Sequence, residues 1–234
     1  MKWLGRSTLL STVVAVVSLV LVAAPASALN LRVPQVGFFS GPLQNYMNIV
    51  DPGINVQTQQ LDAQVWSVSI TGNTDFTLML KNQLGTTASM GVYNGGAPMG
   101  PVPPLFQVFP GGAVAGWYAT LHFGGGNLIV SLFNQNSVFM GQTFYPGADK
   151  DNFGFYIQGP GGTWFSQDAR NLAGPRPQML AYSSLATPGD FWLCFEAAAY
   201  GGTSTFDKVV VNVQSVRPTP AANTTWGSLK AMYR

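Results

Sequence analysis

The sequence predicts an all-β protein, a β-sandwich or jelly roll of roughly a dozen short strands. Three observations support this prediction. Apolar and polar residues alternate with period two in many short runs, and clusters of Gly, Pro and Asn interrupt the chain about every eight to twelve residues. No helical periodicity of useful length occurs before the C-terminal tail. Because no change in composition divides residues 29–216, this range is expected to be a single domain.

The expected elements follow the chain in order. Residues 29–60 are rich in turn signals, and one or two short strands are expected near residues 43–50. The alternating runs 65–70 and 76–81 are expected to form a hairpin joined near Gly72 and Asn73, which are typical turn residues. Further strands are expected at residues 89–94, 105–109, 115–123, 128–133, 138–145, 153–158, 164–165, 179–183, 191–198 and 206–216.

The N-terminus has the pattern of a secretory signal peptide. Lys2 and Arg6 precede an apolar run over residues 9–24, and small residues at 26–28 form a cleavage site. Cleavage is therefore expected after Ala28, which gives a secreted protein, extracellular or at the cell surface, with no stable membrane span. A retained membrane anchor is the alternative, because the run is about as long as the shortest spanning helices; Pro25 and the small residues favour cleavage.

The charge of the chain argues against nucleic acid as a partner. Lys2 and Arg6 account for two of the eleven basic residues, so nine basic residues remain against nine acidic residues, and the expected mature chain has zero net charge. Such a chain has no electrostatic footprint for nucleic acid. It also has little charge repulsion to oppose association with other molecules.

The residue types that carry catalysis are scarce. His122 is the single histidine, and Cys194 is the single cysteine, in an apolar run where a thiol behaves as a small buried hydrophobe; a reactive thiol is the alternative. A catalytic triad needs a nucleophile, a base and an acid together, and a zinc site needs several His or Cys ligands. The prediction is a protein that is not an enzyme.

The acidic residues of the second half of the chain suggest a calcium site, which is expected to be weak or vestigial. Hard cations take oxygen ligands from carboxylates and amides, and six of the nine acidic residues lie between 149 and 207. If the neighbouring strands meet at one end of the sandwich, the candidate ligands gather there. Solvated loop acids, balanced by adjacent lysines, are the alternative. The candidate ligands are Asp149, Asp151, Asn152, Glu196 and Asp207.

Two further segments suggest binding. Trp164 follows two glycines, so its ring is a candidate for stacking on a sugar or a partner, and core packing is the alternative. After a Pro-containing linker from residue 217, residues 224–234 include Trp226, Leu229, Met232 and Tyr233, which a short helix would place on one face. This tail is either a tag read by a sorting machinery or a frayed terminus.

Residues 149–216 resemble a known family. The similarity rests on Asp151-Asn-Phe-Gly-Phe-Tyr156, on Trp192-Leu-Cys-Phe-Glu196 and on Phe206-Asp-Lys-Val-Val-Val-Asn-Val213. These motifs resemble a secreted bacterial β-sandwich domain of unknown function that occurs in proteins with the PEP-type C-terminal sorting signal and in calcium-rich adhesins. The resemblance implies an extracellular sandwich whose acids bind calcium. Lys208 stands where the family has a further acid, and the PEP-type signal itself is absent.

The functional prediction combines these observations. The protein is expected to be a secreted or cell-surface structural or adhesive module without catalysis, binding a cell-surface or matrix component. The alternative is a carbohydrate-binding module of an extracellular system, which requires outward aromatic residues on one sheet face.

Overall fold

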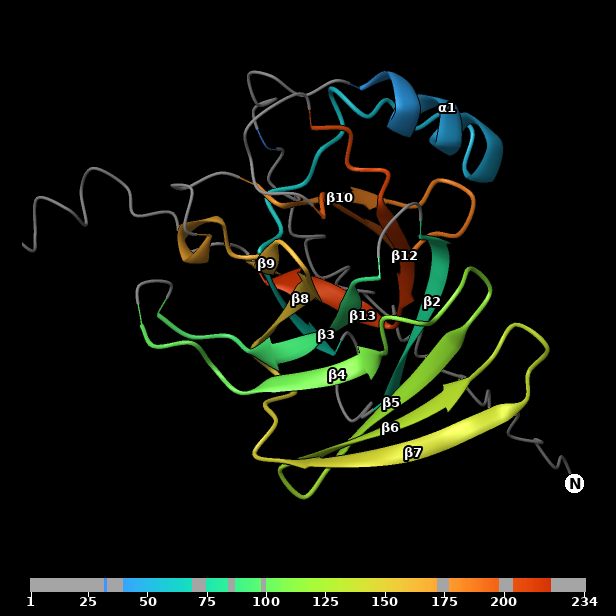
Figure 1. Ribbon diagram of the computed structural model, residues 1–234. Helices are drawn as coiled ribbons and strands as arrows, with labels where there is room; N and C mark the ends of the chain where they lie inside the picture. Colours follow the sequence, from blue (N-terminus) through green and yellow to red (C-terminus); the bar gives the residue numbers. More distant parts are fainter. Residues whose placement is uncertain are drawn as a thin grey trace, which may run out of the picture.

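The strands of the computed structural model form two antiparallel sheets packed face to face (Figure 1). The structure describes residues 32, 40–68, 75–83, 87–97, 100–171, 177–197 and 204–219. The predicted β-sandwich is confirmed. The expected signal peptide and the tail 224–234 lie outside the described residues. Among the residues that are described, no helix has both the length and the apolar character needed to cross a membrane.

The smaller sheet contains β1 (Val65–Val68), β3 (Ser89–Asn94), β4 (Leu105–Phe109), β8 (Phe153–Gly159), β9 (Gly162–Phe165) and β13 (Val216–Thr219). Its strand order is β13-β1-β8-β3-β4, and β9 pairs with β8. The linker expected from residue 217 is therefore wrong at its start, because Arg217 and Pro218 lie in β13 and pair with β1. Pro218 is tolerated there since β13 is an edge strand.

The larger sheet contains β2 (Asp75–Gln83), β5 (Tyr118–Gly124), β6 (Asn127–Phe133), β7 (Phe139–Pro146), β10 (Met179–Ser183), β11 (Phe191–Phe195) and β12 (Val209–Gln214). Its strand order is β10-β11-β12-β2-β5-β6-β7. Gly125 and Gly126 form the two-residue turn between β5 and β6, with φ of 59° and 75°. This conformation matches the twist of a hairpin and favours glycine at both positions.

Aromatic side chains from both sheets fill the space between them. Trp66 of β1 packs edge-on against Phe155 of β8 and Phe191 of β11, with ring centroids 5.7 and 5.1 Å apart. Phe76 of β2 stacks on Phe153 of β8 at 5.2 Å. The period-two runs of the sequence therefore place every second side chain in one shared core.

The hairpin expected from runs 65–70 and 76–81 is wrong. β1 pairs with β13 and β8 in the smaller sheet, whereas β2 pairs with β12 and β5 in the larger sheet. Strands lie at Val65–Val68 and Asp75–Gln83, but they belong to different sheets. A turn signal indicates where a strand ends and carries no information about the sheet that the next strand joins.

The strands expected near residues 43–50 are also wrong, because α1 (Gly41–Val50) is a helix. Pro42 lies in its first turn, where the missing N–H has no effect. Leu43 and Met47, four residues apart, lie on one face and are completely buried. This face packs on β10, β11 and β12, where it covers Tyr182, Trp192 and Cys194.

The carboxylate of Asp51 joins α1 to the sheet beneath it. Asp51 is the C-terminal cap residue of α1 and is completely buried. Its oxygens accept hydrogen bonds from the Ser184 hydroxyl at 2.6 Å, the Trp192 indole at 2.7 Å, and the backbone N–H groups of Leu185 and Ala186. A buried charge is tolerated here because hydrogen-bond donors surround it.

Arg32 is a second charged residue whose side chain is almost completely buried. Arg32 is held between Asp62 and Asp168, with N···O distances of 3.5 and 3.2 Å, and only 7% of its side chain is exposed. Asp168 begins the short 3-10 helix η1 (Asp168–Arg170), and its backbone N–H donates to the side-chain oxygen of Gln64. The ion pairs therefore connect residue 32 to two loops of the sandwich.

Candidate functional site

The outer face of the larger sheet is divided into a covered half and an uncovered half. α1 packs on the half formed by β10, β11 and β12. Figure 1 shows α1 beside β10 and β12, while β5, β6 and β7 lie away from it. No described element packs on the outer side of β2, β5, β6 and β7. This second half is called the uncovered face below, and in the described part of the chain it is open to a ligand.

Strand register arranges the uncovered face in three rows that cross the four strands. One row is apolar and aromatic, one carries hydroxyl and amide groups, and one ends in a histidine–carboxylate pair. The rows are Met79, Tyr118, Phe133 and Phe139; Thr77, Thr120, Ser131 and Gln142; and Asp75, His122, Ile129 and Phe144.

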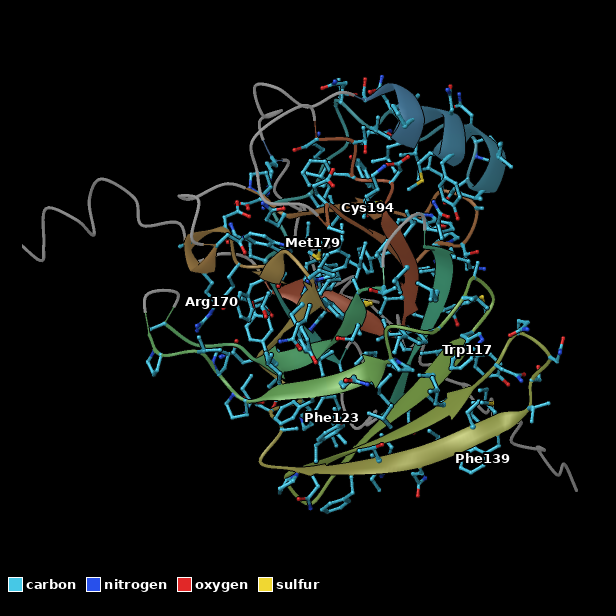
Figure 2. The ribbon with its side chains drawn as sticks, in the orientation of Figure 1. Trp117, Phe123, Phe139, Arg170, Met179 and Cys194 are labelled. Atoms are coloured by element: carbon cyan, nitrogen blue, oxygen red, sulfur yellow. The ribbon has the colours of Figure 1, made fainter. Side chains whose placement is uncertain are left out.

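The aromatic row contains two kinds of ring contact. Tyr118 and Phe133 stack with centroids 4.8 Å apart and planes inclined by 7°. Phe139 meets Phe133 at 5.6 Å with an angle of 61°. Tyr118 and Phe133 each cover one face of the other's ring. The rings most exposed to solvent on this face are Phe139, which is 56% exposed, and Phe144, which is 60% exposed. Both lie on β7, and Figure 2 shows Phe139 at that outer strand.

The polar groups of the uncovered face are partly ordered by one another. The Gln142 amide donates to the Ser131 hydroxyl at 2.9 Å. Nδ1 of His122 lies 2.6 Å from a carboxylate oxygen of Asp75, and both side chains are about half exposed. Hydroxyl, amide, imidazole and carboxylate groups can exchange hydrogen bonds with a hydroxyl-bearing ligand.

His122 therefore has an acid partner, which the sequence did not predict. A histidine oriented by a carboxylate supplies two of the three groups of a hydrolytic triad, which also requires a nucleophile within hydrogen-bonding reach. Cys194 does not supply it, because that thiol lies three strands away under α1 and is completely buried (Figure 2). Burial raises the pKa of the Cys194 thiol well above its ordinary value, which suppresses the reactive thiolate.

The candidate calcium ligands do not converge as expected. Asp149, Asp151 and Asn152 lie in the exposed loop between β7 and β8, where Asp151 pairs with Lys150 at 2.8 Å. The backbone N–H of Asp151 donates to Asp149, and the Asn152 amide donates to the carbonyl of Gly95. The polar side chains of this loop therefore already have protein partners.

Glu196 and Asp207 form a second, separate group. Glu196 is buried and accepts the backbone N–H groups of Thr205 and Phe206. Asp207 accepts the Thr205 hydroxyl at 2.6 Å and pairs with Lys208 at 3.5 Å. Both carboxylates therefore organise the turn that leads into β12.

The length of β12 separates the two groups. The carbonyl of Lys150 accepts the N–H of Val68, and Val68 pairs with Val216, just after the end of β12. Glu196 and Asp207 lie at the beginning of β12, which has six residues. At about 3.3 Å per residue the groups are roughly 20 Å apart. Among the described residues no three His, Cys, Asp or Glu side chains form a cluster that could hold a metal ion.

Trp164 is also placed differently from the expectation of a stacking surface. It lies in β9, is 6% exposed and belongs to the core between the sheets. Trp164 therefore packs in the core, which was the alternative to a stacking surface.

The sequence alone did not identify the exposed residues of β7 or the Asp75–His122 pair as parts of a site. Only strand register places them on one face.

A hollow of about 490 Å³ adjoins this region. The residues that line it are Phe123, the glycines 124–126, Asn127 and the segment 147–150. Asp149 and Lys150 contribute one charge of each sign. Oppositely charged neighbours of this kind do not define a cation site.

Comparison with known proteins adds no assignment. No protein-family model, no curated protein and no solved structure matches this chain.

Proposed function

We propose that the protein is a secreted or cell-surface structural or adhesive module without catalysis, and that it binds a cell-surface or matrix component through the uncovered face. One observation carries this proposal. The outer side of β2, β5, β6 and β7 exposes large apolar side chains beside hydroxyl and amide groups. Large exposed apolar patches on soluble proteins mark interaction sites.

The scarcity of charged residues on the uncovered face favours an uncharged partner surface. The sequence has no Lys, Arg, Asp or Glu between Lys81 and Asp149, a range that contains β5, β6 and β7. In the three rows of the uncovered face, the acid and the base are Asp75 and His122, which pair with each other; Lys81 lies further along β2, near Asp190. The resemblance of residues 149–216 to a secreted domain found in adhesins supports the same class of function.

A single introduced charge tests the adhesive function. Thr120 lies exposed in the middle strands of the uncovered face, so Thr120→Glu places a carboxylate in the expected contact. Purified protein would be titrated onto intact bacterial cells and isolated extracellular matrix. We expect about a tenfold or greater loss of affinity, the effect of roughly 1.4 kcal/mol.

The matched control is Thr58→Glu, an exposed threonine outside the uncovered face, which should bind as the wild type does. Circular dichroism would verify that both variants are folded. Equal binding by the two variants would exclude the uncovered face, and absence of wild-type binding to both materials would refute the adhesive function.

A carbohydrate-binding module is the second candidate. Free ring surface on Phe139 and Phe144 lies beside the hydroxyl and amide row, and sugars present both apolar and hydroxyl surfaces. Glycan-array binding that is lost in Phe144→Ala and retained in Trp164→Phe would support it. Uniform failure to bind glycans, together with retained binding to a protein component, would favour the adhesive function alone.

The absence of catalysis needs its own test, because His122 and Asp75 are paired. Any ligand found would be incubated with the protein and analysed by mass spectrometry. We expect the ligand to be recovered unchanged. Conversion by the wild type that disappears in His122→Ala would show that the protein is an enzyme.

A further inference from the structure

Natural sheets protect their edge strands from pairing with other chains by short length, charge, proline or coverage. The strand orders of the two sheets end at four strands, and three of these four are protected in these ways. β4 has five residues and lies between Pro104 and Pro110. β13 has four residues and contains Arg217 and Pro218. β10 is covered at Ala181 by a bridge to Leu61.

β7 differs from the other three edges. It has eight residues and terminates the larger sheet, and no described residue pairs with its outer edge. Its one proline, Pro146, lies at the end of the strand, and a bulge opposite Leu132 and Phe133 interrupts only its start. The outward N–H and C=O groups of such a strand can accept another strand.

Large apolar side chains accompany this open edge. Val138, Phe139, Met140 and Phe144 are each about half exposed, and they account for four of the eight large hydrophobic residues that are exposed in the described part of the chain. A soluble monomer would keep this strip in water. Strand addition would bury it and would satisfy the outward backbone groups at the same time.

We propose that β7 pairs antiparallel with β7 of a second copy of this chain, so that two larger sheets join into one continuous sheet. An antiparallel pair of identical strands is compatible with a two-fold axis, which makes the contact closed and self-complementary. A centre near Gln142 would bring Met140 of each copy close to Phe144 of the other. This inference does not depend on which ligand the uncovered face binds.

Charge favours a second copy as the occupant. From Asn82 to Ala148 the sequence has no Lys, Arg, Asp or Glu, so two β7 edges approach with no like charges opposed. The nearest described histidine and carboxylate on the same sheet are His122 and Asp75, which lie two and three strands inward and pair with each other. A charged partner strand would have to lose hydration without gaining an ion pair.

The area is sufficient for a reversible dimer. Phe139 and Phe144 are 56% and 60% exposed, and an aromatic side chain can bury about 150–250 Å², so each ring offers roughly 100 Å². With the rest of the strand, both copies together bury on the order of 1,000 Å², the lower end of specific interfaces. The dimer should therefore dissociate on dilution.

Sedimentation velocity over a concentration series tests the proposal. The wild-type protein should shift from monomer to dimer as concentration rises. Gln142→Lys and Phe144→Lys each place a charge on the edge and should remain monomeric at every concentration. Thr120→Lys is the control, because Thr120 is exposed on the same face two strands inward, and it should dimerise like the wild type.

Three outcomes would overturn the proposal. A wild type that is monomeric throughout would show that the β7 edge does not self-pair. Dissociation of Thr120→Lys together with the β7 variants would show that the faces, and not the edges, associate. Dimers that persist in both β7 variants would place the interface elsewhere. Loss of dimerisation with retained binding to cells would leave the adhesive function intact.

Cysteine cross-linking locates the axis. Cys194 is completely buried and does not compete. Gln142→Cys and Thr143→Cys place thiols at the centre of β7, and at least one of them should form a disulfide-linked dimer under mild oxidation. Thr120→Cys should remain uncross-linked. A cross-link from Thr120→Cys, or none from either β7 position, would contradict antiparallel pairing about this centre.

Discussion

The indole N–H of Trp192 donates a 2.7 Å hydrogen bond to the buried carboxylate of Asp51, which joins β11 to the C-terminal end of α1. The same oxygen accepts the Ser184 hydroxyl, and Leu185 and Ala186 complete the set of donors. Burial alone raises the pKa of Asp51, but the four hydrogen bonds outweigh it and hold the pKa below its ordinary value. This carboxylate therefore adds four polar contacts to the apolar packing between α1 and the sheet.

Substitution of Asp51 should destabilise the protein strongly. Asp51→Asn keeps one acceptor oxygen but points an NH₂ group at a hydrogen-bond donor. Because a charge-assisted hydrogen bond is lost, the free energy of unfolding should fall by about 1.5–3 kcal/mol. Asp51→Ala leaves all four donors without an acceptor and should lower the free energy of unfolding by about 3–5 kcal/mol. Chemical denaturation would measure both. Asp149→Asn, in an exposed loop, is the control and should change stability by less than about 0.5 kcal/mol.

Lowering the pH should remove the contribution of Asp51 to the stability of the protein over a defined pH range. Its folded-state pKa lies below the unfolded value, so its stabilisation is present above the unfolded pKa and is lost as pH falls through the folded pKa. The difference in unfolding free energy between wild type and Asp51→Asn should therefore be constant near neutrality and shrink below about pH 4. A difference that already shrinks near pH 6 would contradict this assignment.

Asp168 should have the opposite pH dependence. Burial raises the pKa of Asp168 to about 6, against the attraction of Arg32, and the Asp62 carboxylate adds to the rise. The contribution of Asp168 to stability is present at low pH and is lost as pH rises through about 6.

Relative to Asp168→Asn, the wild type should gain about 1 kcal/mol in unfolding free energy between pH 7 and pH 5. Denaturant titrations of the two proteins at several pH values would measure this gain. A flat difference over the range would mean that the Arg32 ion pair keeps Asp168 ionised throughout.

A methyl group at Gly154 should disturb the packing of Tyr93. Gly154 pairs with Tyr93 across β8 and β3, and an added Cβ would meet the tyrosine ring and hydroxyl. That hydroxyl donates to Gln167 at 3.1 Å. Gly154→Ala should therefore cost about 1–3 kcal/mol, as overpacking does. Gly112→Ala, where a Cβ meets open space, should be nearly neutral in the same thermal melts.

Calcium should not change the thermal stability. Asp149 and Asp151 are roughly 20 Å from Glu196 and Asp207, and all four carboxylates have protein partners. Melting temperatures in excess chelator and in millimolar calcium should agree within error. A calcium-dependent increase would show binding to the native state by mass action, and its loss in Asp149→Asn or in Asp207→Asn would identify which group binds.

The local patterns of the chain determined the strands. Alternation at residues 115–123 and 128–133, with glycines between them, predicts two strands and their turn, and β5 (Tyr118–Gly124) and β6 (Asn127–Phe133) lie there. Period two is a property of the extended backbone itself, so it can be read without knowing any neighbour. The β-sandwich class follows from many such segments of similar length.

The helix was missed for a related reason. Residues 41–50 offer only Leu43 and Met47 as completely buried apolar positions, which is too short a pattern to distinguish from a turn-rich segment. The surface beneath α1, with Tyr182, Trp192 and Cys194, supplies the stabilisation of the helix. Most helical stability in proteins comes from such tertiary packing.

The sequence by itself determined the alternation, the turns, the neutral stretch from Asn82 to Ala148 and therefore the class of fold. Only the tertiary structure decided that β1 and β2 enter different sheets, that β12 separates the acidic groups, and that Asp75 meets His122. The physical reason is range. Backbone periodicity is set by neighbouring residues, whereas a site is assembled by strand register and sheet order between residues far apart in the chain.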